Sequence, residues 1–162
     1  MTKLSFLNKL KLERKLELVE SSEEISTSYI IKSENCIKVA RLAFEAGIYE
    51  NAVSEAYYSI YNIVTALFYK CGIKCENHSA AVILVKELFG LDSFHSIFSE
   101  FKKDRIDYQY YTPTFNNDPI DTKMCNENLR IAQKFTLELR AYMEKLTLED
   151  IKNIRKKFDL LK

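Results

Sequence analysis

The stretch that decides the fold is residues 49–70, YENAVSEAYYSIYNIVTALFYK. Apolar side chains recur there every three or four positions, which predicts a helix. One face of that helix is formed by Tyr49, Val53, Ala56, Ile60, Ile63, Val64 and Leu67. Because Tyr58, Tyr61 and Phe68 lie on the opposite side, the helix is apolar nearly all round. A helix of this kind is either central in its bundle or carries a second interface.

Helical spacing continues on both sides of this stretch, and turn-forming residues are scarce, with 3 glycines and 2 prolines. Further helices are predicted over residues 21–46, 78–89, from about 93 into the segment 102–111, 126–146 and 148–161. The first begins with the capping-box spacing of Ser21 and Glu24. We therefore expect an all-α fold, an antiparallel bundle of four to five helices over residues 21–147. A charged, loosely packed helical extension (1–20) precedes it, and a short charged helix (148–162) follows.

Composition limits the partners that the chain can attract. With 24 basic and 23 acidic residues the net charge is +1, so no overall field draws the protein to nucleic acid or to a membrane. The longest apolar run, residues 80–85, is too short to span a bilayer. The N-terminus alternates lysine with leucine and lacks an apolar signal core, so we expect a cytoplasmic protein.

Two cysteines, Cys71 and Cys75, lie close to His78 and raise the question of a zinc site. Their spacing is not the two-residue gap of a zinc knuckle, and no second pair of ligands follows. Free thiols are therefore the preferred interpretation, and we expect no metal and no cofactor. The templates of phosphate-binding loops, serine nucleophiles and zinc proteases are absent as well. His78 and His95 are interpreted as structural, His78 as a cap at a helix start.

The segment 102–111 is the best candidate for a functional surface. It combines three basic residues with three tyrosines, namely Lys102, Lys103, Arg105, Tyr108, Tyr110 and Tyr111. Cations bind phosphate and aromatic rings stack on unpaired bases, so the pattern suits an RNA or nucleotide surface. The alternative is a helix end in which Arg105 pairs with Asp104 or Asp107 and the tyrosines fill a groove.

Four stretches, taken in order, resemble the HEPN superfamily of small helical domains. They are residues 47–61 (GIYENAVSEAYYSIY), 70–74 (KCGIK), 78–79 (HS) and 105–108 (RIDY). The resemblance covers about residues 22–146, and it is closest to the archaeal and bacterial branch found beside minimal nucleotidyltransferases. It implies a bundle of four or five helices that usually forms a two-fold dimer. Many members are metal-independent ribonucleases, some are toxins paired with a nucleotidyltransferase antitoxin, and others are binding modules.

The ribonuclease members carry an arginine followed four to six residues later by a histidine. Arg105 matches the arginine, whereas the histidine position falls on Tyr110 or Tyr111. A tyrosine, with its pKa near 10, transfers protons poorly at neutral pH. Asn62 stands where a histidine is common in the middle of the family's central helix. The resemblance therefore assigns Arg105 and Tyr110 to a catalytic position. Binding roles are assigned to Lys102, Lys103, Asp107, Tyr108, Tyr111, His78 and Asn62.

From these observations we expect an RNA- or nucleotide-binding component of a nucleotidyltransferase-linked, toxin–antitoxin-like module that lacks the usual Arg–His nuclease site. A homodimer through the central helix and the Arg105 segment would place two copies of that segment around one cleft. Two alternatives stay open: a non-catalytic protein-interaction domain, and an atypical metal-independent ribonuclease.

Overall fold

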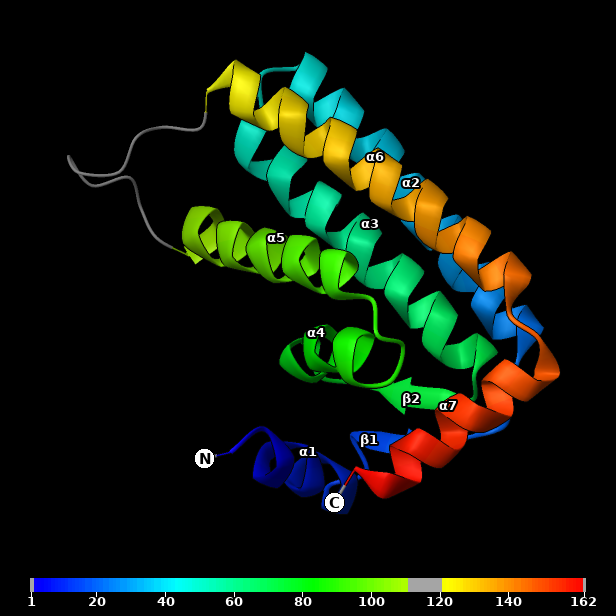
Figure 1. Ribbon diagram of the computed structural model, residues 1–162. Helices are drawn as coiled ribbons and strands as arrows, with labels where there is room; N and C mark the ends of the chain where they lie inside the picture. The colour runs from blue at the N-terminus through cyan, green and yellow to red at the C-terminus, as the bar shows by residue number, and fades with distance from the viewer. Residues whose placement is uncertain (1, 111–120, 162) are drawn as a thin grey trace.

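The computed structural model describes residues 2–110 and 121–161, with only the backbone of Gln109 and Tyr110. These residues form a bundle of helices with a small sheet at one end (Figure 1). The elements are α1 (Lys3–Leu12), β1 (Leu16–Leu18), α2 (Glu23–Glu45), α3 (Tyr49–Lys70), β2 (Ile73–Cys75), α4 (His78–Glu87), α5 (Asp92–Tyr110), α6 (Thr122–Lys145) and α7 (Leu148–Leu160). The prediction of an all-α bundle is confirmed.

Helix α3 lies at the centre of the bundle, where it contacts α2, α4, α5 and α6 (Figure 1). Most of its side chains are buried, and Tyr57, Ile60, Val64 and Leu67 are fully inaccessible to solvent, whereas Tyr58 and Asn62 are half-buried. Burial of each such side chain contributes about 1.5–3 kcal/mol to folding. Of the two explanations for a helix that is apolar nearly all round, the central position is therefore correct.

Helix α2 packs along α3 through small polar residues. The hydroxyl of Ser26 donates to the carbonyl of Ala66 at 2.9 Å, and that of Ser33 donates to the carbonyl of Ser59 at 2.7 Å. Both serines are buried, so these bonds satisfy hydroxyls that would otherwise be costly to bury. The two helices are joined through Gly47, whose φ of +75° favours glycine.

The start of α2 differs from the sequence-based prediction. Ser22, not Ser21, is the N-cap, and its hydroxyl accepts a hydrogen bond from the amide of Ile25 at 3.1 Å. The residue three positions after the cap is therefore Ile25, whose side chain cannot return a hydrogen bond. The capping box predicted for Ser21 and Glu24 is wrong.

The first twenty residues are better packed than their charge suggests. Strand β1 pairs antiparallel with β2, with Leu16 opposite Cys75. Leu7, Leu10 and Leu16 are buried in the main core. The expectation of loose packing is wrong for these leucines. The helical extension predicted for residues 1–20 is confirmed for residues 3–12 and wrong for residues 16–18, which form β1.

Helices α5 and α6 cover α3 on the sides left open by α2. Phe94 of α5 meets Phe135 of α6 edge to face, with ring centres 4.8 Å apart. Helix α6 begins four residues before the predicted position, because the Asp121 carboxylate caps it by accepting from the amide of Met124 at 2.6 Å. Helix α4 lies across the end of α5 nearest the small sheet (Figure 1).

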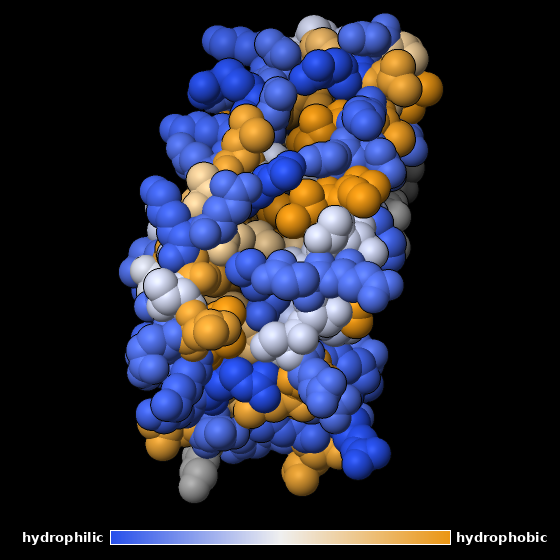
Figure 2. All heavy atoms as spheres, turned by 90° about the vertical axis from the view of Figure 1, so that its right-hand side faces the viewer, coloured by the Kyte–Doolittle hydropathy of each residue, from blue (hydrophilic) through white to orange (hydrophobic). Residues whose placement is uncertain are grey.

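The outer surface is mixed in character. Figure 2 shows the side of the molecule along which α2 and α6 run, where hydrophobic atoms form small groups among hydrophilic ones. Exposed leucines such as Leu42 and Leu137 belong to these two helices. Within the described part of the chain, none of the helices has the length and apolar character needed to cross a membrane.

Candidate nucleic-acid interface

Arg105 is held on α5 by two tyrosines of α3. Its Nη2 atom donates to the hydroxyl oxygen of Tyr58 at 2.9 Å. The guanidinium carbon lies 5.1 Å from the ring centre of Tyr58 and 5.4 Å from that of Tyr57. Cation–π contacts of this kind contribute about 0.5–2 kcal/mol, more as water is excluded. The aromatic rings therefore fix the position and orientation of a charged, partly buried guanidinium.

His78 joins the same cluster from α4. Its Nδ1 atom is hydrogen-bonded to the hydroxyl of Tyr57, and its ring stacks on that of Tyr61 with ring centres 4.0 Å apart. It is the first residue of α4, and the cap is the preceding Asn77, whose side chain accepts from the amide of Ala80 at 3.0 Å. The interpretation of His78 as a cap is thus wrong, because its ring turns toward α3.

The protonation of this cluster follows from burial and charge. Desolvation lowers the pKa of His78 below its ordinary value, and the positive charges of Arg105 and Lys102 lower it further. Burial raises the pKa of Tyr57 far above its usual range and that of Tyr61 to about 12. At neutral pH the cluster therefore contains a neutral imidazole beside protonated phenols.

The protonated phenol of Tyr57 can donate a hydrogen bond to Nδ1 of His78. In that case the proton of the neutral imidazole lies on Nε2. Nε2 makes no hydrogen bond to any residue that the structure describes. In that tautomer Nε2 is a donor, suited to a phosphate oxygen. In the other tautomer Nδ1 donates to the Tyr57 oxygen, and Nε2 has a lone pair that can accept a proton.

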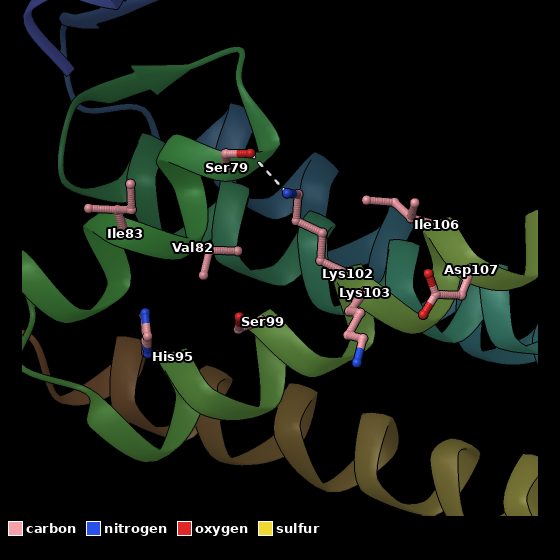
Figure 3. A pocket seen from close by; sticks show the side chains of 9 residues that line it. All are labelled: Ser79, Val82, Ile83, His95, Ser99, Lys102, Lys103, Ile106 and Asp107. Atoms are coloured by element: carbon pink, nitrogen blue, oxygen red, sulfur yellow. Dashed lines mark hydrogen bonds between the residues drawn. The ribbon is translucent and has the colours of Figure 1, made fainter. Parts of the chain in front are cut away.

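Lys102 lies one turn of α5 before Arg105 and Lys103 two residues before it, and both line a groove between α4 and α5. The Nζ atom of Lys102 donates to the hydroxyl of Ser79 at 2.9 Å, across to α4 (Figure 3). Lys103 is exposed and points the other way in this view, and Asp107 lies at the end of the groove beyond it. The predicted residues Lys102, Lys103 and Asp107 thus line one groove, and Lys102 and Arg105 both act electrostatically on His78.

Other predicted site residues lie elsewhere. Tyr108 turns toward α6, where its hydroxyl lies 3.5 Å from the sulfur of Met124. The amide of Asn62 faces α2 and lies 3.5 Å from the Cys36 sulfur. These two hydrogen bonds join Tyr108 and Asn62 to residues other than Arg105. For Tyr110 the structure describes only the backbone at the end of α5, and Tyr111 lies outside the described residues.

Sequence reasoning missed the three tyrosines of α3 as site residues. Tyr57, Tyr58 and Tyr61 have the spacing of one helical face, which was available in the sequence. Their partners Arg105 and His78 are 17 to 48 positions away, so only the packing of α3 against α4 and α5 brings them together.

The thiols of Cys71 and Cys75 have low reactivity at neutral pH. Burial raises the pKa of Cys71 to about 12 and that of Cys75 to about 11, so both stay protonated at neutral pH. The Cys75 thiol lies 3.4 Å from the Asn77 carbonyl oxygen. Among the residues described, no three or more His, Cys, Asp or Glu side chains are grouped to hold a metal ion.

The profile of the HEPN domain matches residues 26–142, which is most of the chain and spans α2 to α6. The chain belongs to the HEPN domain family. Both Arg105 and His78 lie inside the matched region, as do all three tyrosines of the cluster. Membership supports a role connected with nucleotides or RNA in general terms. No protein of curated function matches the sequence.

Proposed function

We propose that this HEPN domain binds single-stranded RNA through Arg105, His78 and Lys102, and does not cleave it. The observation that carries the proposal is the cluster itself. A guanidinium is held by Tyr58 and the ring of Tyr57, next to a neutral histidine and a lysine. Guanidinium groups bind phosphate oxygens in a fork, and ammonium groups bind them as point charges. Tyr58 and Tyr61 are half-buried, so part of each ring is accessible to an unpaired base.

Binding without cleavage follows from the proton positions. Cleavage of RNA without a metal needs a base that takes the proton of the 2′-hydroxyl. We assign the donor of the Tyr57–His78 hydrogen bond to the Tyr57 hydroxyl, which places the His78 proton on Nε2, and the tyrosines retain their own protons because burial raises their pKa. With that assignment the cluster supplies donors to phosphate, and His78 does not act as the base.

We further propose that the domain acts as a homodimer and with a nucleotidyltransferase in a toxin–antitoxin-like module. The support is the order of the four stretches that resemble the nucleotidyltransferase-linked branch. A dimer would show in light scattering as a mass of twice the 19.0 kDa chain. Co-purification with a nucleotidyltransferase encoded by a neighbouring gene would test the partner.

The test of RNA binding uses a single-stranded oligoribonucleotide with a free 5′-hydroxyl and a 3′ fluorophore, in EDTA. The Arg105→Met variant keeps much of the side-chain volume and loses the charge, so we expect at least about a tenfold loss of affinity. The slope of log affinity against log salt should also fall by about 0.7, the value for one phosphate contact on a single strand. The control is Arg130→Met, which removes a charge at an exposed position of α6 where Arg130 pairs with Glu127.

The same mixtures are run on a denaturing gel. Intact RNA with Arg105-dependent binding supports the proposal. Cleavage that disappears in Arg105→Met would show an atypical ribonuclease instead. If folded wild-type protein neither binds nor cuts RNA, the proposal fails and a protein-interaction domain becomes the better explanation.

A further inference from the structure

Helix α7 completes a groove that shares no lining residue with the Arg105 cluster. The helix turns back at the end of α6 and crosses the end of the bundle that carries the small sheet (Figure 1). The groove, about 730 Å³ in volume, lies between α7, the end of α6 and the end of α4, and we call it the α6–α7 groove. Because α7 follows residues 26–142, the groove depends on a helix outside the region that the HEPN profile matches.

The α6–α7 groove has the shape of a site for a helix. The residues of α7 that line it recur every three or four positions and therefore share one face of that helix. They include Asp150, Asn153, Lys157 and Leu160. From Asp150 to Leu160, at about 1.5 Å per residue, this face extends for about 15 Å, nearly three helical turns. A hollow of that length between helices accommodates one short helix laid along it.

The lining includes a set of hydrophobic side chains that we call the apolar floor. Ile154 is buried, and Phe89, Tyr142 and Leu146 are half-buried, so part of each of these three remains open to solvent. Leu160 adds a side chain that is 75% exposed near the end of α7. Covering these side chains with another apolar surface removes them from water, which favours association.

Three lysines form what we call the cationic rim. Lys145 lies on α6, and Lys156 and Lys157 lie on α7, all of them exposed, so ammonium groups stand on both walls. In the described part of the chain none of the three forms an ion pair. The carboxylate of Asp150 already accepts from the amide and the hydroxyl of Thr147 at 2.9 and 2.6 Å. Among the described lining residues, three positive charges against one negative charge leave a net charge of +2.

An apolar floor below a cationic rim favours an acidic amphipathic helix over RNA. A nucleic-acid backbone is charged along its whole length, so its phosphates would satisfy the rim and leave the aliphatic part of the floor uncovered. An amphipathic helix lays its apolar face on such a floor. If its flanks carry carboxylates, they come to lie beside the lysines on both walls. Charge complementarity of this kind selects the partner and fixes its orientation.

We infer that the α6–α7 groove binds an acidic amphipathic helix of a partner protein, with the apolar side chains of that helix on the apolar floor and its carboxylates at the cationic rim. The inference does not rest on the proposed RNA binding. Helix α7 gives the domain a surface for a protein, whereas α3, α4 and α5 carry the Arg105 cluster.

The experiment measures the fluorescence anisotropy of a labelled peptide of about 14 residues, about four helical turns. Leucine stands at every third or fourth position and glutamate at most others. A second peptide has glutamine in place of glutamate, and a third has alanine in place of leucine. We expect the first peptide to bind at least ten times more tightly than either of the others, because only it matches both the floor and the rim. Equal binding of the first peptide and either of the others, or no binding to the folded protein up to about 1 mM, would overturn the inference.

Variants at exposed positions of α7 locate the binding. Lys157→Glu reverses a charge of the rim and Leu160→Gln removes an exposed side chain of the floor, so each should weaken binding of the acidic peptide at least tenfold. The matched controls are Lys152→Glu and Leu148→Gln, which change exposed residues of α7 that do not line the groove and should leave binding unchanged. Circular dichroism checks that all four variants fold. Equal effects of the groove and control variants would exclude the site.

The oligoribonucleotide that tests the proposed function distinguishes the two proposals. If it displaces the peptide, and Lys157→Glu weakens RNA binding as much as Arg105→Met does, the groove belongs to an RNA surface and the inference fails. If Arg105→Met weakens only RNA binding and Lys157→Glu only peptide binding, both proposals stand. If the peptide binds in the groove and the RNA does not bind at all, the proposed function fails and the inference stands.

Discussion

His78 is the residue through which pH acts on the site. Its ring contacts the neutral phenols of Tyr57 and Tyr61 on α3, and the cations Arg105 and Lys102 on α5 act on it electrostatically. Burial and those cations lower its pKa, so the folded protein holds this proton less tightly than the unfolded chain does. When fewer protons are bound in the folded state, stability rises with pH.

The wild-type protein should therefore lose stability as pH falls from about 7.5 to 5.5, through the ordinary histidine pKa near 6.5. In the His78→Asn variant an amide oxygen replaces Nδ1 as the acceptor for Tyr57, and no proton is taken up at this position. The free energy of unfolding, measured in urea at several pH values, should fall less steeply in that variant. Parallel profiles for the two proteins would mean that His78 does not control this dependence.

At the scale of the element, the turn between α3 and β2 is closely packed around Gly72. Gly72 has a φ of +69°, and a side chain there would meet the guanidinium of Arg155 and the Val19 carbonyl oxygen, 2.6 Å away. Gly90 has a similar φ of +67°, and a side chain there would meet nothing within 4 Å. Alanine substitutions at the two glycines therefore distinguish the free-energy cost of the backbone conformation from the cost of steric crowding.

Gly90→Ala should cost about 1–2 kcal/mol, the penalty of a left-handed conformation for a residue with a β-carbon. Gly72→Ala should cost about 3 kcal/mol or more, because it also displaces Arg155 from its carbonyl acceptors. Urea unfolding of both variants gives the comparison. Equal losses would show that Arg155 moves aside without cost.

Single elements also show what the sequence could predict. The bounds of α3 follow from periodicity, because an apolar stretch bounded by Gly47 and Gly72 has few alternatives. A helix start that depends on one capping side chain was harder to predict. Ser21 and Ser22 have the same side chain, and only the folded structure shows that Ser22 is the N-cap. Strands β1 and β2 have three residues each and no periodicity of their own.

The site was predictable only in part for a similar reason. Spacing along one helix placed Lys102 and Arg105 on one face, because residues three apart share a face. The contacts of Arg105 with Tyr58 and of His78 with Tyr61 depend on how α4 and α5 cross α3. A single sequence does not encode those crossings in any local pattern.

At the scale of the whole molecule, Arg155 ties together three parts of the chain. From α7, its Nη1 atom donates to the carbonyls of Val19, Cys71 and Gly72 at 2.8, 3.2 and 2.9 Å. These acceptors follow β1, end α3 and precede β2. The ends of the chain are held in the same way, since the Lys11 ammonium donates to the carbonyls of Phe158 and Leu161.

Arg155→Met keeps the apolar stem and removes the donor, so three carbonyls lose a charged partner. We expect a loss of about 2–3 kcal/mol in the free energy of unfolding. The adjacent and exposed Lys156 is the control, since Lys156→Met should change stability by no more than about 0.5 kcal/mol.

Because Arg155 joins α7 and the small sheet to α3, the wild-type protein should unfold in one cooperative transition, followed by circular dichroism and tyrosine fluorescence together. Separate transitions in the wild-type protein would show that α1, β1 and α7 form a unit that unfolds independently of the helices that carry the site. Arg155→Met would then destabilise only the unit formed by α1, β1 and α7.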